Sequence, residues 1–530
     1  MRLWNGWGDD SVTVTLPQSA IELIKDYIGP GEPVKSATLD SVLASVPKSR
    51  MPKHPLINTD SENRMRHSHG QSVKDWVALR FNRFGRFTDG VASPSTEEEI
   101  HELISFALKK GIILIPSGGR TSVVGHLTPP DSRKPVLTLS LEQMRGLKHL
   151  DMKSHLASFY PGTSGVELEA SLNPSGLTLG HFPQSYDYST VGGWVVTRSY
   201  GQLSRGYGGI DQLFAGGRLV GGSGILEMPP YPGSAAGPDI RQMVLGSEGR
   251  MGVLSEVLVR VKQCPEKEYF HGIIFPDWDH AMEAVRQLGQ SSIPFCMLRL
   301  SNPEESRVSL ALSGEGRIKD WLNKYLSFRG ISNDGCILLL GYSGLSSIVR
   351  KAKREALSLC RRQKGVHLFA PPGKSWLKNR FRMPYLKNTL WDMGYVADTL
   401  ETAVSWGNVK AVMLDIEESL RNALLDRNEK CLAFSHLSHV YSSGSSIYTT
   451  FLFRLAPDPE ETIDRWQALK TSASKAIQRH GGTITHQHGV GLDHAEYLAA
   501  EKGEVGMSIL RDIYRHVDPN GLFNPGKLVR

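Results

Sequence analysis

The positions of hydrophobic and polar residues predict an alternation of helices and strands along the first half of the chain. Over residues 97–107 the apolar side chains recur at the spacing of one helix face, and the run 94–99 before them is typical of a capped helix start. An uninterrupted apolar run at 111–115 then predicts a buried strand. The same reasoning predicts two further strands and a helix, at 135–139, 256–261 and 164–172.

The second half of the chain alternates in a similar way after a change in composition. Residues 264–268 are polar and mark a domain boundary. Before residue 80, short helical pieces are interrupted by prolines and include the basic, histidine-bearing stretch 64–70. Beyond the boundary, strands separated by helices are predicted at 297–300, 336–341 and 447–453. This mixture predicts an α+β fold.

Length and composition limit the class of protein. A chain of 530 residues is too long for one hydrophobic core and predicts about two to four domains. Apolar residues at 40% and charged residues at 22% are typical of a soluble globular protein. The formal charge is +7, yet no run reaches about five or six like charges, so nucleic-acid binding is not expected. The positive charge favours anionic substrates or an anionic membrane surface.

Cysteines and apolar runs indicate the compartment. The five cysteines are far apart and form no Cys-x-x-Cys pair, which favours free thiols in a reducing environment. The first ten residues lack the apolar core of a signal peptide, and no apolar run approaches the roughly 18 to 20 residues that span a bilayer. We therefore expect a cytoplasmic protein that is soluble or lies peripherally on a membrane surface.

Two loops rich in glycine, serine and threonine carry the strongest chemical signal. The first, 116–122, follows the strand predicted at 111–115, and the second, 182–194, lies further along the chain. Glycine lets backbone N–H groups approach an anion, and small hydroxyl side chains add donors. One such loop is as often an ordinary turn, but the pair predicts a long, phosphate-bearing cofactor. Neither loop has the usual dinucleotide or P-loop fingerprint.

The loops and the tail together resemble a known family of flavoproteins. A third glycine-rich turn occupies 245–254, and the chain closes with the Pro/Gly-rich segment 518–527. With these segments the sequence resembles the vanillyl-alcohol-oxidase family of FAD proteins and, within it, the alkyldihydroxyacetonephosphate synthase branch. The resemblance covers roughly residues 64 to 518. It implies a two-subdomain FAD-binding domain of the PCMH type, an α+β cap domain that binds substrate, and a homodimer.

Pattern and resemblance together divide the chain into four units. They are an N-terminal helical region (1–80), the FAD-binding domain (81–263), the cap or substrate domain (264–480) and a C-terminal segment that completes the active site (481–530). Covalent relatives place a flavin-linking histidine after paired glycines, where this chain has Arg120 and Thr121. The resemblance therefore implies that FAD is bound noncovalently.

The resemblance implies that four segments contact FAD. They are the first loop, the second loop, the residues after it and the third turn: Ser117, Gly118, Gly119, Arg120, Thr121, Ser122 and Val123; Gln184, Ser185, Tyr186, Asp187, Tyr188, Ser189 and Thr190; Thr197, Arg198, Ser199 and Tyr200; Glu248, Gly249, Arg250, Met251, Gly252, Val253 and Leu254.

Three residues of the predicted cap match catalytic or substrate-binding positions of the synthases. Tyr448 matches the tyrosine that donates and accepts a proton, although a packed strand aromatic is the alternative interpretation. Arg299 matches the active-site arginine, whose guanidinium could hold a phosphate, although a surface cation is the alternative. Lys387, ahead of a Glu-Thr-x-x-x-Trp motif at 401–406, replaces an arginine and keeps its charge without the planar fork.

Histidines supply the remaining candidates. His486 and His488 flank Gln487, where the synthases carry three consecutive histidines, so a role that needs the central imidazole is in doubt. The resemblance implies that these two histidines polarise or deprotonate the reacting groups, and it places His181 near the flavin. The motif histidines could also form part of a metal site with His436 and His439. Hydrogen bonds in a polar pocket satisfy such imidazoles equally well, so no metal is predicted.

Three functions remain open on these residues. The resemblance implies a transferase of ether-lipid synthesis, which exchanges the acyl group of acyl-dihydroxyacetone phosphate for a fatty alcohol through an adduct at flavin N5. The alternative is an FAD-linked dehydrogenase or oxidase of 2-hydroxy acids such as D-lactate or glycolate, which the tail 524–527 favours. That branch carries a metal-binding His-x-Gly-Asp-Gly-Asn strand, and 442–445 does not match it. The third is a flavin- or lipid-binding protein without turnover.

Overall fold

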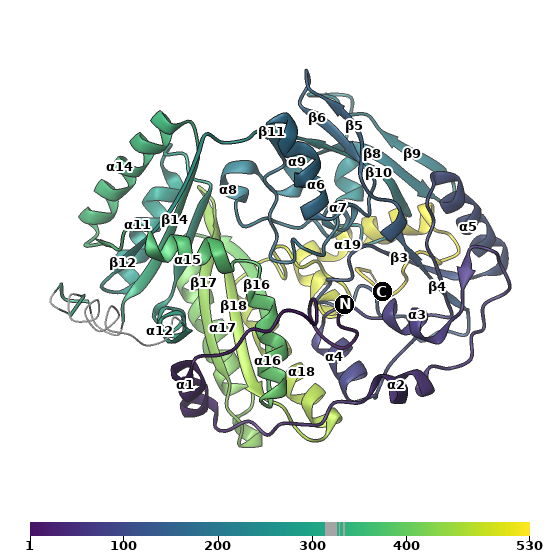
Figure 1. The fold of residues 1–530 in the computed structure, drawn as a ribbon, viewed down its shortest axis with the longest axis horizontal. Helices are drawn as coiled ribbons and strands as arrows, with labels where there is room; N and C mark the ends of the chain where they lie inside the picture. Colours follow the sequence, from purple (N-terminus) through teal and green to yellow (C-terminus); the bar gives the residue numbers. More distant parts are fainter. Residues whose placement is uncertain (313–325, 328, 332–333, 530) are drawn as a thin grey trace.

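The strands of the protein form two groups of sheets (Figure 1). The computed structural model describes residues 1–312, 326–327, 329–331 and 334–529. Sheets of four and five strands lie on the right of Figure 1, and a sheet of seven strands lies on the left. Helices cover both groups, so the architecture is the predicted α+β class.

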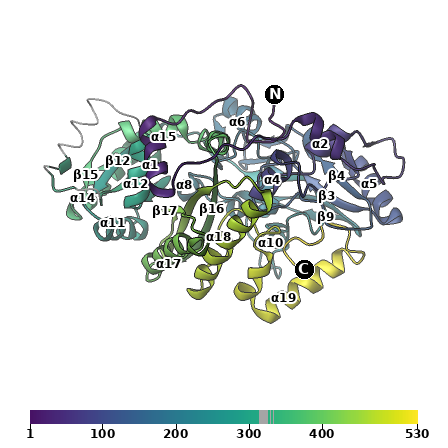
Figure 2. The same cartoon turned by 90° about the horizontal axis from the view of Figure 1, so that it is seen from below.

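The first 80 residues supply helices that lie against both groups of sheets. α1 packs Ile24 and Ile28 against Tyr395 and Leu432 of the seven-stranded sheet. Figures 1 and 2 show α1 on that side and α2 on the opposite side. The predicted helical region thus runs along both groups, and its limits as a unit stay a prediction. Its elements are α1 (Gln18–Ile28), α2 (Leu39–Ser45), β1 (Ile57–Asn58), α3 (Ser61–Arg66) and α4 (Val73–Arg80).

The four-stranded sheet carries the first glycine-rich loop. Its order is β1-β2-β4-β3, with β2, β4 and β3 parallel. α5 connects β2 to β3; the Thr96 side chain accepts the Glu99 N–H at its start, and Gly111 ends it with φ of 66°. The predicted helix is thereby confirmed. The strands and helices are β2 (Gly90–Ala92), α5 (Glu97–Lys110), β3 (Ile113–Ser117), β4 (Val136–Ser140) and a short 3-10 turn (Leu141–Gln143).

The five-stranded sheet is antiparallel, in the order β5-β6-β10-β8-β9. Its core also includes side chains of α6, α7 and α19. The elements are β5 (Leu147–Asp151), β6 (Leu156–Phe159), α6 (Gly165–Leu172), a 3-10 turn (Asn173–Ser175), β7 (Leu177–Thr178), α7 (Val191–Thr197), α8 (Ser204–Tyr207), α9 (Ile210–Leu213), β8 (Phe214–Gly221), β9 (Gly224–Met228), α10 (Arg241–Val244), β10 (Val253–Arg260) and β11 (Lys262–Gln263), which pairs with β7.

The seven-stranded sheet is antiparallel and has the order β15-β12-β14-β13-β17-β18-β16. α11, α14, α17 and α18 share one hydrophobic core with it. The elements are β12 (Lys267–Phe275), α11 (Trp278–Gln290), β13 (Met297–Ser301), α12 (Pro303–Leu312), β14 (Cys336–Gly344), α14 (Ser346–Arg362), β15 (Val366–His367), α15 (Pro371–Asn379), a 3-10 turn (Met383–Tyr385), α16 (Leu386–Asp392), β16 (Tyr395–Ser405), α17 (Val409–Asn422), a 3-10 turn (Leu425–Arg427), β17 (Leu432–Val440), β18 (Gly444–Arg454) and α18 (Pro459–Arg479).

The C-terminal segment returns to the glycine-rich loops. A 3-10 turn (Ala495–Tyr497) and α19 (Leu498–Val517) precede the tail, which lies beside β3. There the Leu114 N–H donates to the Leu522 carbonyl, and the Asn524 N–H donates to the Leu114 carbonyl, both at 2.8 Å. The tail therefore extends the four-stranded sheet next to the first loop. Across the described ranges, no helix has the length and apolar character needed to cross a membrane.

Candidate active site

The first glycine-rich loop lies directly against the second. β3 ends at Ser117, and the two glycines that follow touch the second loop. A Cβ atom at Gly118 would lie 2.2 Å from Thr190 Oγ1, and one at Gly119 would lie 1.8 Å from the Tyr188 carbonyl oxygen. Because no side chain fits in this space, glycine is required at both positions. The structure thus joins the two loops that the sequence assigned to one cofactor.

The first loop keeps its hydrogen-bond donors free. Within the described residues, the backbone N–H groups of 118–122 donate no hydrogen bond, and the buried Ser117 hydroxyl has no partner. The Arg2 guanidinium donates to the carbonyls of Gly119 and Arg120, which brings a cation to the loop. Free amides, a free hydroxyl and a nearby cation suit a pyrophosphate. The residues present therefore fit the diphosphate of FAD. Sequence reasoning missed Arg2, because it is far from the loop in sequence.

Contacts around the second loop fix His181 as an uncharged ring. Thr190 caps α7, and the Ser189 hydroxyl accepts a hydrogen bond from Trp194 Nε1 at 2.8 Å. The His181 ring lies 4.7 Å from the Trp194 ring, and its Nε2 lies 3.0 Å from the Ser199 hydroxyl. Burial lowers the pKa of His181 to about 3. Its Nδ1 is buried without a partner among the described residues, so it can serve a ligand.

Other residues predicted to contact FAD are engaged elsewhere. The Thr197 hydroxyl donates to the Gly193 carbonyl, and the Arg198 guanidinium reaches Gln242 at 3.2 Å on the surface. The Tyr186 ring stacks on Phe381 at 4.9 Å. The Tyr188 hydroxyl lies 2.8 Å from the Tyr385 hydroxyl. Contacts of these side chains with FAD stay predictions. The same holds for residues 184, 185 and 187 of the second loop and for 249–254, which form the turn before β10 and its first two residues.

The loop that carries the predicted histidines is held by two buried carboxylates. The first is Glu248, whose side chain accepts the N–H groups of Val490 at 2.5 Å and Gly491 at 2.9 Å. It also lies 3.1 Å from His126 Nε2. The sequence predicted Glu248 only as an FAD contact, and that contact stays a prediction. The structure gives its carboxylate the task of fixing the end of the histidine loop.

The second carboxylate belongs to Glu401 on β16. Its Oε1 accepts the N–H groups of Gln487 at 2.6 Å and His488 at 2.8 Å, and it lies 3.5 Å from His488 Nδ1. Burial raises the pKa of Glu401 to about 8, so the carboxyl is mostly protonated at neutral pH. Its Oε2 is buried without a partner among the described residues. Sequence reasoning gave Glu401 no role, although its motif at 401–406 was a usable signal.

Tyr448 lies in a row of side chains that crosses three strands. Glu401, Tyr448 and His436 are directly opposite one another on β16, β18 and β17, so their side chains project from one face. The Tyr448 ring stacks on His436 at 4.9 Å and meets the His488 ring edge-on at 5.8 Å. Burial raises the pKa of Tyr448 above its ordinary value, and burial lowers that of His488 to about 3. The cluster is therefore uncharged at neutral pH.

Arg299 reaches the same face from β13. Its Nη2 lies 2.8 Å from Glu305 Oε1 on α12 and 3.2 Å from His436 Nδ1. Burial would raise the pKa of Glu305, but His436 and Arg299 outweigh it and lower this pKa to about 2. Arg299 Nε is buried without a partner among the described residues, so one donor remains for a ligand. The structure thus brings Arg299 and Tyr448 together through His436.

Gln487 takes part in a second cluster with His486. His486 Nε2 lies 2.6 Å from the Tyr441 hydroxyl, and its ring stacks on His439 at 4.8 Å and lies 4.7 Å from Tyr200. Burial lowers the pKa of His486 well below its ordinary value. Gln487 Oε1 lies 3.2 Å from His439 Nε2. The glutamine that replaces a histidine of the synthases therefore still joins the loop to β17.

Lys387 pairs with Asp398, and its charge adds to burial and to Lys470 in lowering the pKa of His488. It lies on α16, its Nζ is 3.9 Å from Asp398 Oδ1, and it lines a cavity of about 10 Å³ with Trp76 and Trp391. Because Lys387 and Arg299 are both cations, their separate carboxylate partners do not test whether they hold one phosphate together, and that role stays a prediction. A substrate-binding role for Lys387 alone stays a prediction.

The histidines considered as metal ligands have hydrogen-bond partners instead. His436 Nδ1 lies 2.9 Å from Glu305 Oε1, and His439 Nδ1 lies 2.9 Å from the Ser204 hydroxyl. Over the described residues, no group of three or more His, Cys, Asp or Glu side chains is placed to hold a metal ion. Proton transfer and hydrogen bonding are thus the chemistry that this arrangement supports.

Comparison with known proteins identifies the class of flavoprotein. Two family models match the chain, the FAD binding domain over residues 88–228 and the C-terminal domain of FAD linked oxidases over 264–528. The alkyldihydroxyacetonephosphate synthase of Dictyostelium discoideum is 27% identical over 99% of this chain and 93% of its own length.

Solved structures show the same fold. An alkyldihydroxyacetonephosphate synthase superposes with a TM-score of 0.84 at 24% identity, covering 99% of this chain and 98% of the other. A p-cresol methylhydroxylase superposes with a TM-score of 0.70 at 13% identity, covering 89% and 94%. The fold is therefore a PCMH-type FAD-binding domain with a cap domain. Because the model for the C-terminal domain spans half of the chain, this protein belongs to the FAD-linked oxidase family, and its cofactor is FAD.

Proposed function

We propose that this protein is an alkylglycerone-phosphate synthase-like transferase. It would exchange the fatty acid of an acyl-dihydroxyacetone phosphate for a fatty alcohol, in a step of ether-lipid synthesis. The observation that supports this most is the uncharged cluster of Tyr448, His488 and Glu401, which carries exchangeable protons beside the loops suited to FAD. The similarity to synthases of this name over nearly the whole chain supports the same reaction.

The exchange needs proton transfer but no net electron transfer. One C–O bond to the fatty acid breaks and one C–O bond to the alcohol forms, and the proton lost by the alcohol balances the one taken by the departing acid. Tyr448 is a neutral phenol between two imidazoles, so it can give a proton and take one back. His488 is neutral and can accept a proton, while Glu401 holds it in place.

The phosphate of the substrate needs a cation that is not fully neutralised. Arg299 is paired with Glu305 through Nη2 and keeps a free buried Nε–H. We propose that this donor holds the phosphate end of the substrate, with Lys387 as a second candidate. When bound, FAD supplies the ring that carries the three-carbon unit between the departing acid and the incoming alcohol.

The same proposal predicts where the protein lies and how many chains assemble. Long-chain substrates and a formal charge of +7 support a position on the surface of a membrane, from which both lipids are taken up. We also propose a homodimer, on the basis of the family resemblance. Light scattering should then give twice the chain mass of 58.6 kDa, and a value near 58.6 kDa would contradict the dimer.

Product analysis tests the proposed reaction. The purified holoprotein is incubated without oxygen or any electron acceptor with palmitoyl-dihydroxyacetone phosphate and hexadecanol, and the products are measured by mass spectrometry. We expect the hexadecyl ether and free palmitate in equal amounts. Reduction of the flavin by D-lactate or glycolate, with no ether formed, would instead identify a 2-hydroxy acid oxidoreductase.

A further inference from the structure

A second cavity lies outside the candidate active site, between the segment before α3 and the four-stranded sheet. Its volume is about 800 Å³, which is in the range of small-molecule sites. Arg64, Lys48 and Lys53 line it, together with Thr59 and Ser61. Arg64 opens the basic stretch 64–70, a feature of the sequence that the proposed reaction does not use.

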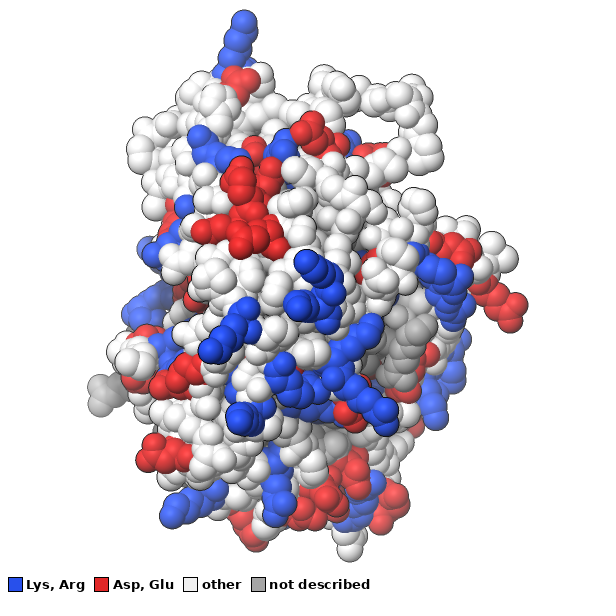
Figure 3. All heavy atoms as spheres, turned by 90° about the vertical axis from the view of Figure 1, so that its right-hand side faces the viewer, with Lys and Arg blue, Asp and Glu red and all other residues white. Residues whose placement is uncertain are grey.

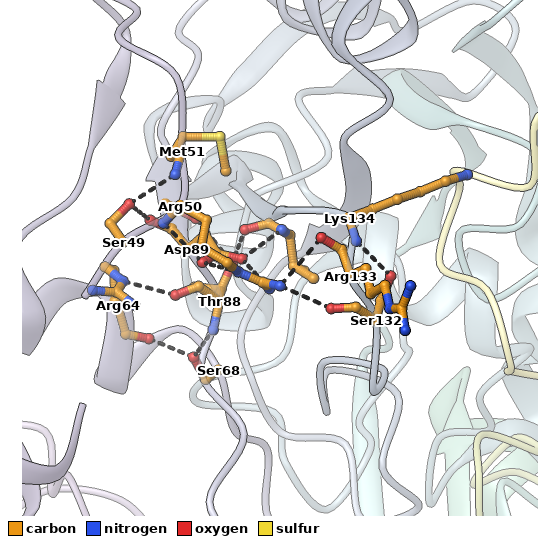
Figure 4. Close-up of polar contacts among 12 residues, drawn as sticks. Ser49, Arg50, Met51, Arg64, Ser68, Thr88, Asp89, Ser132, Arg133 and Lys134 are labelled. Carbon is orange, nitrogen blue, oxygen red and sulfur yellow. Dashed lines mark hydrogen bonds and ion pairs between the residues drawn. The ribbon is translucent and has the colours of Figure 1, made fainter. Parts of the chain in front are cut away.

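Arg64 is a buried cation with an unused donor. It is 2% exposed, its Nε donates to the Thr88 carbonyl at 2.7 Å, and its Nη2 is buried without a partner among the described residues. Figure 4 shows this bond beside the Arg50–Asp89 pair. The Arg50 guanidinium makes two hydrogen bonds to Asp89, at 2.9 and 2.7 Å. Asp89 is thus paired with another arginine and attracts Arg64 only at longer range, and no carboxylate of the described residues bonds to the Arg64 guanidinium.

The rest of the lining is also cationic and polar. Lys48 and Lys53 are exposed and form no ion pair with any described residue. The side-chain hydroxyls of Thr59 and Ser61 make no hydrogen bond within the described chain. None of the residues that line the cavity, all of them described, is an Asp or Glu. Three cationic residues therefore line the cavity, and no carboxylate is among its lining residues.

The nearby acidic side chains have hydrogen-bond or ion-pair partners of their own, although Asp60 and Asp89 still act on Arg64 electrostatically. Asp60 accepts the Asn63 N–H at the start of α3, and Glu102 lies 3.2 Å from His54 Nε2. Figure 3 shows the same side of the molecule, where Lys and Arg side chains gather near the centre and a group of acidic side chains lies above them.

The cavity and the FAD loops lie at opposite edges of the four-stranded sheet. β2, β4 and β3 are parallel, with Gly90 opposite Leu137 and Leu137 opposite Leu114. The first glycine-rich loop follows the carboxyl end of β3, whereas Thr88, which Arg64 contacts, precedes the amino end of β2. A ligand in this cavity would therefore not occupy the FAD site.

We propose that this cavity is a second anion site, which binds a phosphate monoester through Arg64, Lys48 and Lys53. A dianion matches three cationic lining residues better than a carboxylate does, and a guanidinium with an unpartnered Nη2 suits phosphate oxygens. The hydroxyls of Thr59 and Ser61 add donors, and apolar lining by residues such as Met51 and Ile57 leaves room for the rest of the molecule. The phosphate can come from a soluble metabolite or from a lipid headgroup.

Equilibrium dialysis of the FAD-loaded protein with radiolabelled inorganic phosphate tests the site. We expect saturable binding that weakens at least about tenfold in Lys48→Glu/Lys53→Glu, because two attractive charges become repulsive. The matched control is Lys430→Glu/Lys475→Glu, which makes the same charge change at exposed lysines of the cap side. Because the proposed function also places a phosphate beside Lys387, the comparison is repeated in the Lys387→Ala background, where Lys48→Glu/Lys53→Glu should weaken the remaining binding by the same factor.

Two results would overturn the proposal: no saturable binding, or equal weakening in both lysine pairs. Arg64→Lys keeps the charge but loses the planar fork, and we expect it to weaken binding as well. Because Arg64 is buried, retention of FAD reports whether that variant folds, and the exposed lysine pair keeps the test valid if it does not. The readout is binding, so it is independent of the transferase reaction.

A second arm identifies the source of the phosphate. Dioctanoyl phosphatidic acid, below its aggregation concentration, is compared with inorganic phosphate, and dioctanoyl phosphatidylcholine serves as the control. Tighter binding of the phosphatidic acid supports a lipid headgroup, and equal binding supports a soluble phosphate. Equal binding of the phosphatidylcholine, which has no monoester, would contradict the proposed chemistry.

Discussion

Tyr448 can move a proton only because its surroundings keep it neutral and fix its orientation. Its ring is stacked on His436 and meets His488, and both imidazoles are uncharged as a result of burial. A phenol with a raised pKa is a weak acid in the ground state. Such a phenol can act as a general acid or base where an adjacent imidazole shares its proton while charge develops on the reacting groups.

Tyr448→Phe removes the hydroxyl and leaves the ring packing in place. We expect kcat to fall by about 10²- to 10⁴-fold, the usual contribution of a general acid–base group, while bound FAD per chain stays unchanged. Turnover and flavin absorbance measure the two quantities. Tyr395→Phe is the matched control, since among the described residues its hydroxyl bonds to nothing but the backbone of Gly29 and Gly31. Equal activity of both variants would show that Tyr448 is a packing residue.

The ionisation of Glu401 makes the free energy of unfolding depend on pH. Its pKa is about 8 in the folded protein against an ordinary value of 4.5, so between these values the unfolded chain releases a proton that the folded protein keeps. Stability therefore falls as pH rises through this window, by up to about 1.4 kcal/mol per pH unit, and levels off above it.

Glu401→Gln keeps an acceptor oxygen for the two backbone N–H groups but cannot ionise. We expect the variant to gain stability relative to the native protein between about pH 5 and pH 8. Over this range the ionisation of Glu401 destabilises the native protein, whereas the variant has no group to ionise at this position. Urea unfolding at several pH values measures the difference. Parallel profiles for the two proteins would mean that Glu401 is ionised in the folded state.

At the scale of elements, the histidine loop 485–491 is fixed from both sides of the site. Glu401 on the seven-stranded sheet accepts the N–H groups of Gln487 and His488, and Glu248 before β10 accepts those of Val490 and Gly491. The loop therefore has little freedom even though it has no regular secondary structure. Its position is determined by residues far away in sequence.

Glu248→Gln places an amide N–H₂ against the backbone donors of Val490 and Gly491. We expect a loss of about 1–3 kcal/mol in the free energy of unfolding, the cost of leaving buried donors unpaired. The matched control is Glu256→Gln on β10, where the carboxylate contacts Lys148 and Ser158 near the surface. This change should lower the free energy of unfolding by less than about 1 kcal/mol. Similar losses in both variants would contradict the anchoring role.

Gly119→Ala tests the cradle formed by the two loops. The added Cβ would lie 1.8 Å from the Tyr188 carbonyl oxygen, so the loops must separate. We expect the Kd for FAD to rise at least about tenfold, which corresponds to about 1.4 kcal/mol. Gly407→Ala, where a Cβ meets nothing within 4 Å, should leave the Kd unchanged. An unaltered Kd for Gly119→Ala would exclude the first loop from the FAD site.

The glycine-rich loops could be predicted because their chemistry is local. The strands that carry Glu401 and His436 were not predicted, because β16 and β17 place polar residues such as Ser435 and Thr402 in buried positions and lack a clear alternation. The row from Glu401 to His436 exists only through strand pairing, which sequence spacing does not reveal. Family resemblance supplied Tyr448 and Arg299, but not their partners.

For the whole molecule, the candidate site is assembled from segments that are far apart in the chain. Arg2 reaches the first glycine-rich loop, the tail lies beside β3, and the seven-stranded sheet supplies Tyr448. Local patterns could not place Arg2, and they gave the limits of the units only as predictions. Function therefore depends on how the cap and the FAD-binding domain are held together, for which the histidine loop is a main contact.

The central claim is that this FAD-linked protein transfers a group without a net change in redox state. The most direct measurement is the number of ether molecules formed per bound flavin under strictly anaerobic conditions, with acyl-dihydroxyacetone phosphate and a fatty alcohol but no electron acceptor. A transferase regenerates its oxidised flavin in each cycle, so we predict many products per flavin. A yield of no more than one product per flavin, with the flavin left reduced, would contradict the account.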